Sequence, residues 1–300
     1  MCIRDSGRPI SSFLRDDPVE LERLIAALPE PARKGLASIV TLSWNAPQFT
    51  RVAIESIRAF TKHPYEIIVV DNGSGPETTT WLRTLERESS DVRVIFNETN
   101  RGFAGGCNQG MAAARGDYVV LLNNDVIVTE GWLEGLIDGV ERSPSTGVSA
   151  PRSVNVAGDQ AVTDADYNNV EQMHVYAAAR RARYRGQGYL SDRVIGFCMC
   201  MKRIVFEEIG GIDERFGVGN FEDDDYSIRV RAAGYTMFVC EDVFIHHIGS
   251  ATFKANNVDY SARMQENWSK FAAKWGLPSE YPAFGYDARA AISRLSLIHI

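Results

Sequence analysis

Residues that could bind a divalent cation stand directly after an apolar segment of this chain. Tyr118–Leu122 is apolar and is followed by Asn123, Asn124 and Asp125, after which apolar residues resume. A carboxylate held at the end of a buried strand suits Mg²⁺ or Mn²⁺, which take one or two carboxylates and complete their shells with water and substrate phosphates. Asn-Asn-Asp is also good turn chemistry, so the motif by itself leaves a metal site and a polar turn open.

Two further segments could hold a nucleotide. Asp71 opens an Asp-Asn-Gly-Ser sequence, and its carboxylate could either accept hydrogen bonds from a base or close a turn. Asn100–Asn108 is rich in glycine, which lets a backbone approach a ligand beside a helix N-terminus. Its glycine spacing matches neither the dinucleotide fingerprint nor a Walker A loop.

Acidic and imidazole side chains cluster in the second half of the chain. Four consecutive acids, Glu222–Asp225, begin the helix predicted over Phe221–Ala233. Helix capping explains one or two of them, but four adjacent carboxylates repel one another unless they meet a cation, meet a basic partner or include a catalytic base. His246 and His247 end a predicted strand, where a structural role and metal ligation are about equally favoured.

The spacing of apolar residues predicts elements that would bring these groups together. The predicted strands are Ser38–Ser43, Glu66–Val70, Val92–Phe96 and Tyr118–Leu122. The predicted helices are Gln48–Phe60, Glu77–Glu88 and Ala104–Ala114. This alternation is typical of an α/β fold with a parallel sheet covered on both faces. Ligands of such sheets bind where the strands end, so Asp71, Asn100–Gly106 and Asn123–Asp125 should line one rim.

The second half is less regular. Residues 153–192 show little periodicity and predict a mobile loop region facing a substrate. Further predicted elements are strands at Val194–Met201, Thr236–Cys240 and Val243–His247 and a helix at Tyr260–Trp275.

Composition excludes several classes of protein. The 300 residues carry a net charge of −7, which argues against nucleic-acid binding. The five cysteines form no C-x-x-C pair and are expected to be buried and reduced, as in a cytosolic protein. No apolar run approaches the roughly 18 residues of a membrane span. Residues 1–6 and 295–300 resemble translated sequencing adapters, so we expect neither terminus to be native.

Taken in order, these segments resemble the family 2 glycosyltransferases of GT-A fold that build bacterial polysaccharides and O-antigens, including rhamnosyltransferase-like members. The similarity covers about residues 37–275. Ser38–Asn45 looks like the nucleotide-side opening of the family, Asp71 matches its base-binding aspartate, and Asn100–Asn108 looks like its Asn-x-Gly-Phe-x-x-Gly-x-Asn stretch. Asn123-Asn124-Asp125 stands where the family has Asp-x-Asp, with Asn123 replacing the first aspartate.

The resemblance implies a GT-A fold, with a Rossmann-like, mostly parallel central sheet and helices on both faces. It implies an N-terminal extension at 1–36, a GT-A domain at 37–276 and a tail at 277–300. Within that domain, residues 37–125 would form the nucleotide-binding half and residues 126–276 the acceptor half.

The resemblance also implies an activity: inverting transfer of a sugar from a UDP-, dTDP- or GDP-sugar to a hydroxyl of a glycan or lipid-linked acceptor, dependent on Mg²⁺ or Mn²⁺. Asp223 would be the catalytic base. The implied nucleotide-sugar-binding residues are Thr41, Asn45, Asp71, Asn100, Gly102, Phe103, Gly105, Asn108, Asn123 and Asn124. The implied metal ligands are Asp125 with His246 or His247, and the implied acceptor-side residues are Gly196, Glu222 and Asp225.

Two other functions stay open from the sequence. A sugar-1-phosphate nucleotidyltransferase would need a glycine-rich basic loop after the first strand, where this chain has Trp44–Pro47. A catalytically inactive module that binds a nucleotide or glycan is compatible with the missing first aspartate at Asn123. We expect a cytoplasmic protein; the run Arg180–Arg185 predicts either peripheral contact with an anionic membrane at its inner face or a solvated basic surface.

Overall fold

The computed structural model describes residues 35–249, 256 and 260–280. The predicted extension at 1–36 and tail at 277–300 lie almost wholly outside these residues, as do both foreign-looking ends. Among the described residues, no helix combines the length and the apolar character needed to cross a membrane.

The first half of the fold alternates strands and helices. Its elements are β1 (Ala37–Ser43), α2 (Pro47–Phe60), β2 (Tyr65–Asp71), α3 (Pro76–Glu88), β3 (Val92–Phe96), α4 (Gly102–Ala113) and β4 (Tyr118–Leu122). These strands are parallel and lie in the order β3-β2-β1-β4. The predicted strands and helices of this half are confirmed to within two residues at each end. The carboxyl ends of these four strands meet at one edge of the sheet, as the parallel arrangement requires.

The second half extends the same sheet. Its elements are β5 (Val126–Ile127), α5 (Trp132–Glu141), β6 (Thr146–Ser153), η3 (Gly158–Gln160), α6 (Val170–Arg183), β7 (Gly188–Ser191), β8 (Cys198–Lys202), α7 (Arg203–Ile209), η4 (Glu214–Phe216), α8 (Glu222–Ala232), β9 (Thr236–His247) and α10 (Tyr260–Trp275). The sheet continues from β4 as β8-β6-β9-β5, and β7 pairs with β9. β8 is antiparallel to β4 and β6, whereas β6 and β9 are parallel.

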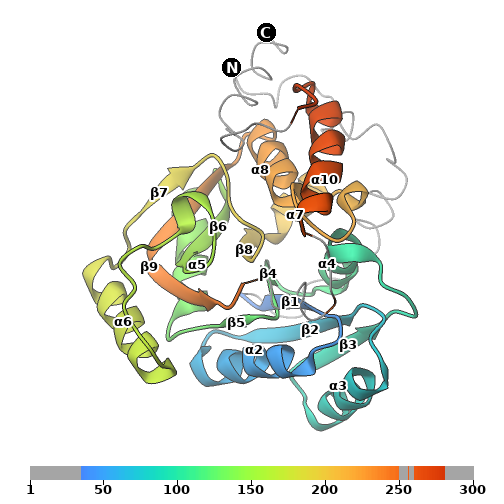
Figure 1. Ribbon diagram of the computed structural model, residues 1–300. Coiled ribbons are helices and arrows are strands. Elements are labelled where there is room, and N and C mark those ends of the chain that lie inside the picture. Colours follow the sequence, from blue (N-terminus) through green and yellow to red (C-terminus); the bar gives the residue numbers. More distant parts are fainter. Residues whose placement is uncertain (1–34, 250–255, 257–259, 281–300) are drawn as a thin grey trace.

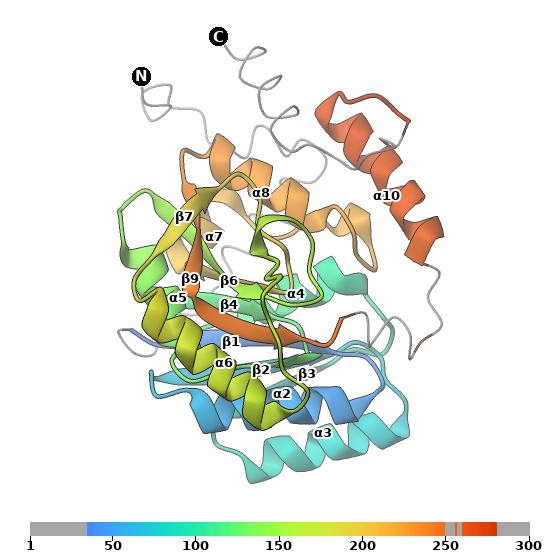
Figure 2. The same ribbon diagram turned by 60° about the vertical axis from the view of Figure 1, so that its left-hand side comes forward.

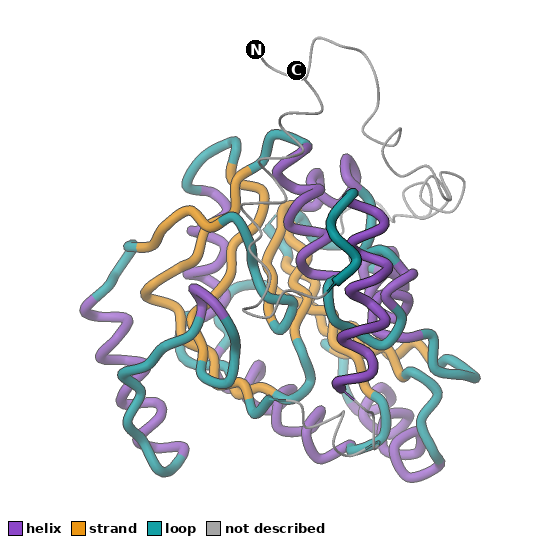
Figure 3. Tube along the Cα trace, turned by 45° about the horizontal axis from the view of Figure 1, so that its top comes forward, coloured by secondary structure: helices purple, strands orange, loops and turns teal. Residues whose placement is uncertain are grey.

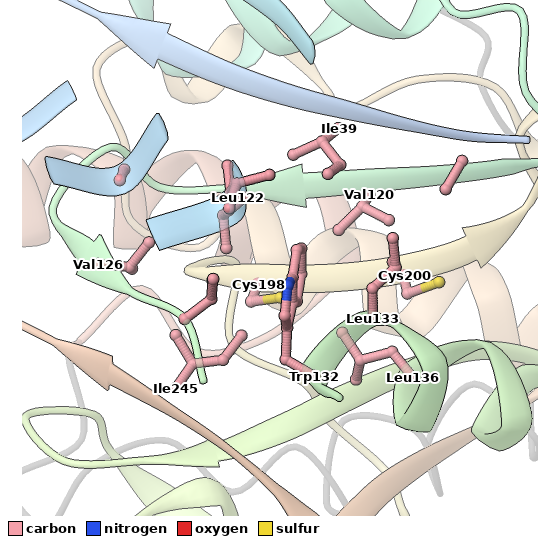
Figure 4. Packing of buried hydrophobic residues seen from close by; sticks show 14 of the residues in the cluster. Ile39, Val120, Leu122, Val126, Trp132, Leu133, Leu136, Cys198, Cys200 and Ile245 are labelled. Atoms are coloured by element: carbon pink, nitrogen blue, oxygen red, sulfur yellow. The ribbon is translucent and has the colours of Figure 1, made fainter. Parts of the chain in front are cut away.

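Apolar side chains cover both faces of the sheet, so the fold has three layers. One cluster joins the sheet to α2, α3 and α5, and the other joins it to α4, α7 and α8. In Figures 1 and 2, α2 and α3 lie on one side of the strands, with α8 and α10 on the other. Figure 4 shows Trp132 of α5 beside Cys198, within the first cluster. The expected α/β fold with a mostly parallel central sheet and helices on both faces is confirmed.

Three predictions for the second half differ from the structure. The strand predicted at Val194–Met201 is β8, Cys198–Lys202, which begins later than predicted. Residues 153–192 do not form one long loop, because they contain helix α6, which lies against β9 (Figures 2 and 3). Its buried face consists of Met173, Ala177 and Arg180, which gives too weak an apolar repeat to detect in the sequence. The two short strands predicted around residue 241 are one continuous strand, β9, with an irregular register opposite Pro151 and Arg152.

Candidate active site

A cleft of about 690 Å³ lies at the carboxyl ends of the parallel strands. Residues from both halves of the domain line it. Those that the sequence analysis singled out are Asn100, Gly102, Phe103, Asn123, Asn124, Asp125, Gly196, Glu222, Asp223 and His247. The edge of the sheet therefore gathers most of the chemically active groups into one cavity, as expected for ligands of α/β sheets.

Asp125 and His247 face each other in this cleft. Short pairing between β5 and β9 sets Val126 opposite His247, which places the imidazole beside the end of β4. His247 Nε2 lies 3.3 Å from Asp125 Oδ1 and 3.4 Å from the side-chain amide of Asn123. The imidazole ring also stacks on Phe197, with 5.2 Å between ring centres.

The second ring nitrogen of His247 determines what this pair can bind. His247 Nδ1 lies 3.2 Å from the carbonyl oxygen of Asn155, which favours a proton on Nδ1. In the neutral ring Nε2 is then an acceptor, with the Asn123 side-chain amide and the Asp125 carboxylate both within 3.4 Å. Two acceptors as close as Nε2 and Asp125 Oδ1 repel each other unless a proton or a metal cation lies between them, and a carboxylate beside an imidazole is a donor set that fits Mg²⁺ or Mn²⁺. The described residues contain no group of three His, Cys, Asp or Glu side chains that could hold a metal, so a bound ion would need ligands from substrate and water.

His246 lies away from Asp125. Successive side chains of a strand point to opposite faces, so His246 and His247 cannot both reach one ion. The hydroxyl of Tyr167 lies 2.6 Å from His246 Nδ1, and burial lowers the pKa of this histidine. Of the two histidines, His247 lines the cleft and His246 does not, so the geometry favours His247 over His246 as the partner of Asp125.

Asp223 lies in the first turn of α8 and also lines the cleft. The backbone amide of Gly196 donates to Asp223 Oδ2 at 3.0 Å, and the amide of Asp224 donates to Oδ1 at 2.9 Å. The side chain is buried, with a residue exposure of 8%. Gly196 lies so close that an added Cβ would stand 3.4 Å from the Cβ of Asp223. The carboxylate is therefore held in one orientation by backbone groups.

The other acids of this turn have different environments. Arg193 forms an ion pair with Asp224, yet burial and the adjacent Asp223 raise the pKa of Asp224 to about 7. Burial and Asp223 also raise the pKa of Glu222 well above its usual value. One oxygen of Glu222, Oε2, is buried and has no hydrogen-bond partner among the described residues.

Asp225 does not line the cleft, so its predicted acceptor-side position is not supported by the geometry. Its carboxylate accepts from Arg229 at 2.9 Å, from the indole of Trp275 at 3.0 Å, and pairs with Lys274 at 2.7 Å. Because the helical repeat turns this position away from Asp223, Asp225 ties α8 to α10.

The glycine-rich segment packs mainly against protein. The α4 backbone meets the loop before α8: the Phe103 amide donates to Gly217 O at 2.7 Å, and Gly102 has a φ of 77°. The side-chain nitrogen of Asn108 donates to the carbonyl of Ile212, and its side-chain oxygen accepts from the amide of Ile212, at 2.8 Å each. Gly105 lies beside Glu214 and does not line the cleft. Nucleotide contacts from Asn108 and Gly105 are therefore not supported, whereas Asn100, Gly102 and Phe103 do line the cavity.

The other residues predicted to bind nucleotide, Thr41, Asn45 and Asp71, do not line the cleft. Asp71 is fully buried, and neither of its carboxylate oxygens forms a well-aligned hydrogen bond with the described residues. Burial raises its pKa, although the nearby hydroxyl and amide of Ser74 act in the opposite direction. The hydroxyl of Thr41 is likewise buried without a partner among the described residues. Asn45 accepts from the amide of Gly75 at 3.0 Å and donates to Asn256 at 2.8 Å.

Sequence reasoning missed several residues of the site. Asn72 organises the rim, because its amide donates to Asn100 at 2.9 Å and to the carbonyl of Gly102 at 2.8 Å. Its position next to Asp71 was the only signal. Asn155, Arg193 and Phe197 come from stretches without a chemical motif, so only the folded chain brings them to the cleft.

Comparison with known proteins places this architecture in a family. Residues 38–210 match the sequence model described as Glycosyl transferase family 2. The chain is 26% identical over 254 residues to uncharacterized protein y4gI of Sinorhizobium fredii, covering 80% of this chain and 27% of that protein. It is 22% identical over 274 residues to a glucosyl-dolichyl phosphate glucuronosyltransferase of Haloferax volcanii, covering 88% and 84%. The chain thus spans only about a quarter of the length of the first relative.

Solved structures show the same fold. GalNAc-T7 with UDP, GalNAc and Mn²⁺ aligns with a TM-score of 0.60 at 12% identity, covering 89% of this chain and 57% of that one. The mannosyltransferase PcManGT of Pyrobaculum calidifontis, in complex with GDP-Man and Mn²⁺, aligns with a TM-score of 0.58 at 16% identity, covering 93% and 82%. The predicted GT-A fold is confirmed, and the chain belongs to glycosyl transferase family 2.

Proposed function

We propose that this domain transfers a sugar from a nucleotide-diphosphate sugar to a hydroxyl group of a glycan or lipid-linked acceptor, with inversion at the anomeric carbon. The observation that carries this proposal is the Asp223 carboxylate, fixed by two backbone amides in the cleft that also holds Asp125 and His247. A carboxylate held in this way can take a proton from a hydroxyl group placed beside it.

The proposed reaction is a single displacement. The acceptor hydroxyl gives its proton to a carboxylate oxygen of Asp223 while its oxygen forms a bond to the anomeric carbon. The bond between that carbon and the diphosphate oxygen breaks, and its electron pair leaves with the nucleoside diphosphate. Attack on the side opposite the leaving group inverts the configuration.

Asp125 and His247 would hold a divalent cation, which would neutralise charge that develops on the leaving diphosphate. The charge of the cleft supports the proposal that a divalent cation binds there. Its described lining includes four acidic side chains, those of Asp125 and Glu222–Asp224, although the pKa values of Glu222 and Asp224 are raised, and one guanidinium, that of Arg193, which pairs with Asp224. A diphosphate entering beside these acids needs a positive charge close by.

Asp71 would recognise the nucleotide base. Its buried oxygens without well-aligned partners support this role, because an unpaired buried carboxylate is costly unless a donor meets it. We expect Asp71→Asn to weaken the binding of UDP, dTDP or GDP by about 1–3 kcal/mol, the usual cost of losing a hydrogen bond to a charged group. Equal affinities of wild type and variant in calorimetry would remove Asp71 from the site.

The contacts of Arg180 and Arg181 give little support to the membrane contact predicted from Arg180–Arg185. Arg180 pairs with Glu241, and Arg181 donates to the carbonyl of Glu130 at 2.6 Å. These contacts leave Arg183 and Arg185 as the main exposed cations of the run, which favours a solvated basic surface.

The proposed function is tested with a donor panel. UDP-glucose, dTDP-rhamnose and GDP-mannose, each with Mn²⁺ and a mixture of saccharide acceptors, should be screened for release of nucleoside diphosphate. We expect one nucleotide class to support release that EDTA abolishes and Mn²⁺ restores, with a product of opposite anomeric configuration in the NMR spectrum. Retained configuration would contradict the single displacement, and tight nucleotide binding without any turnover across the panel would favour the inactive binding module.

A further inference from the structure

The backbone that leads into the catalytic turn has an unfavourable conformation. Asn220 and Phe221, the two residues before α8, have φ values of 80° and 70°. An aromatic residue seldom adopts this left-handed region, because its Cβ comes too close to the backbone. The turn sets the direction in which α8 begins, and it lies two residues before Asp223. Some contact elsewhere must stabilise this conformation.

One side chain of α10 meets this backbone directly. The side-chain nitrogen of Asn267 donates to the carbonyls of Phe216 and Gly219 at 2.7 Å each, and it lies 3.3 Å from the carbonyl of Asn220. Lys270 donates to the side-chain oxygen of Asn267 at 3.0 Å, which fixes the amide orientation from the other side. Asn267 is 1% exposed, so water does not replace these bonds.

Apolar and charged contacts strengthen the same link. Phe221 stacks on Phe271 with 5.4 Å between ring centres and packs against Trp268, both from α10. Lys274 and Trp275 bind Asp225, two residues after Asp223. The turn, α8 and α10 all lie beyond residues 38–210, the part of the chain that matches the family. The support for the catalytic turn therefore comes from a separate C-terminal helix.

We infer that Asn267 is a positioning residue for the transfer reaction: by binding the carbonyls of residues 216–220, it holds the turn that aims the Asp223 carboxylate at the acceptor hydroxyl. This inference rests on the proposed function, in which Asp223 is the base. It concerns a residue that need not touch substrate, cofactor or the reacting atoms.

The test compares Asn267→Ala with Gln265→Ala, a matched loss of a side-chain amide on the exposed face of α10. Donor cleavage is measured with UDP-glucose, dTDP-rhamnose and GDP-mannose in Mn²⁺. The number and affinity of binding sites for UDP, dTDP and GDP are measured by calorimetry. Turnover is expressed per calorimetric binding site, so that a loss of folded protein does not count as a loss of catalysis. Asn267→Asp, which keeps the side-chain shape, serves as a second variant if Asn267→Ala does not fold.

We expect the Asn267 variant to lower kcat per site about 10–100-fold, because small displacements of a catalytic group have effects of this size. Nucleotide affinity should stay within about twofold, since the donor-side rim is unchanged, and Gln265→Ala should match wild type. An Asn267 variant with wild-type kcat per site, beside an Asp223→Asn variant without turnover, would overturn the inference and leave the proposed function intact. Equal turnover in wild type and Asp223→Asn would instead overturn the proposed function and the inference together.

Discussion

The two adjacent histidines of β9 illustrate how a single residue step separates two roles. His247 faces Asp125, whereas His246 meets the hydroxyl of Tyr167 on the other side of the strand. The sequence placed both near a carboxylate but could not choose between them, because the choice depends on which face of β9 turns toward β5. Asp223 and Asp225 differ for a similar reason, since helical periodicity directs one into the cleft and the other toward α10.

We expect Asp125→Ala and His247→Ala to lose the gain in nucleotide affinity that Mn²⁺ provides, whereas His246→Ala keeps it. Loss of a metal ligand should weaken Mn²⁺-dependent binding by at least the roughly 10–100-fold that outer-shell changes cost. Calorimetry of UDP, dTDP and GDP with and without Mn²⁺ measures this difference. If His246→Ala loses the Mn²⁺ effect and His247→Ala retains it, the metal site has been placed on the wrong side of β9.

At the scale of elements, α4 is joined to the loop before α8 by close backbone contact at Gly102. A Cβ at Gly102 would lie 2.5 Å from the carbonyl oxygen of Gly217, and the φ of 77° is itself unfavourable for other residues. We expect Gly102→Ala to lower the free energy of unfolding by about 2–4 kcal/mol, the sum of backbone strain and overpacking.

Gly186→Ala is a matched control for this prediction. Gly186 has a φ of 67°, but nothing lies within 4 Å of a Cβ added there, so this variant should cost only about 1 kcal/mol of backbone strain. Urea unfolding measures both variants. Equal losses of stability would show that the contact between α4 and Gly217 is loose in solution.

The first turn of α8 should make stability depend on pH. The pKa of Asp224 is raised from 3.8 to about 7 in the folded protein, chiefly by burial, so the folded state binds this proton more tightly than the unfolded state. The resulting stabilisation is complete below pH 4 and is lost as pH rises to about 7. The advantage of wild type over Asp224→Asn in the free energy of unfolding should therefore shrink across this range, by the order of 1 kcal/mol or more.

Urea unfolding at several pH values between 4 and 8 checks the sign. An advantage of wild type that grows with pH would mean that the ion pair with Arg193 outweighs burial and keeps Asp224 charged.

The elements also show what the sequence could predict. The strands and helices from β1 to β4 have strong apolar periods and were predicted within two residues, as was α10. Helix α6 was missed because Arg180, one of its few buried residues, is a charged side chain satisfied by Glu241 from β9. A partner 61 positions away gives no local signal. Asn108 and Gly105 matched a motif, but their contacts with Ile212 and Glu214 depend on tertiary packing.

At the scale of the whole molecule, the sheet joins the two halves of the domain, and one cleft is lined by residues of both. The first half of the sheet supplies Asp125 and the rim residues Asn100, Gly102 and Phe103, while the second half of the chain supplies His247, Gly196 and Asp223. α10 then covers α8 from outside, through the apolar cluster of Phe216, Phe221 and Phe271. Catalysis in this account requires residues from both halves of the domain, and the Asp223 carboxylate is the group that accepts the proton of the acceptor hydroxyl.

The central claim is that Asp223 removes the proton of the acceptor. Asp223→Asn keeps the shape of the side chain and removes the proton acceptor, so kcat for donor cleavage should fall about 10²–10⁴-fold, as for loss of a general base. The affinity for nucleotide with Mn²⁺ should stay near wild type, because Asp125 and His247 are unchanged.

Asp225→Asn is the comparison, since it lies two residues away but faces Lys274 and Trp275; it should lower stability and reduce kcat per nucleotide-binding site far less than Asp223→Asn does. The decisive measurement is kcat per calorimetric binding site for these two variants and wild type. The account predicts that kcat per site collapses in Asp223→Asn and not in Asp225→Asn. The account is contradicted if Asp223→Asn keeps most of its turnover while Asp225→Asn loses it.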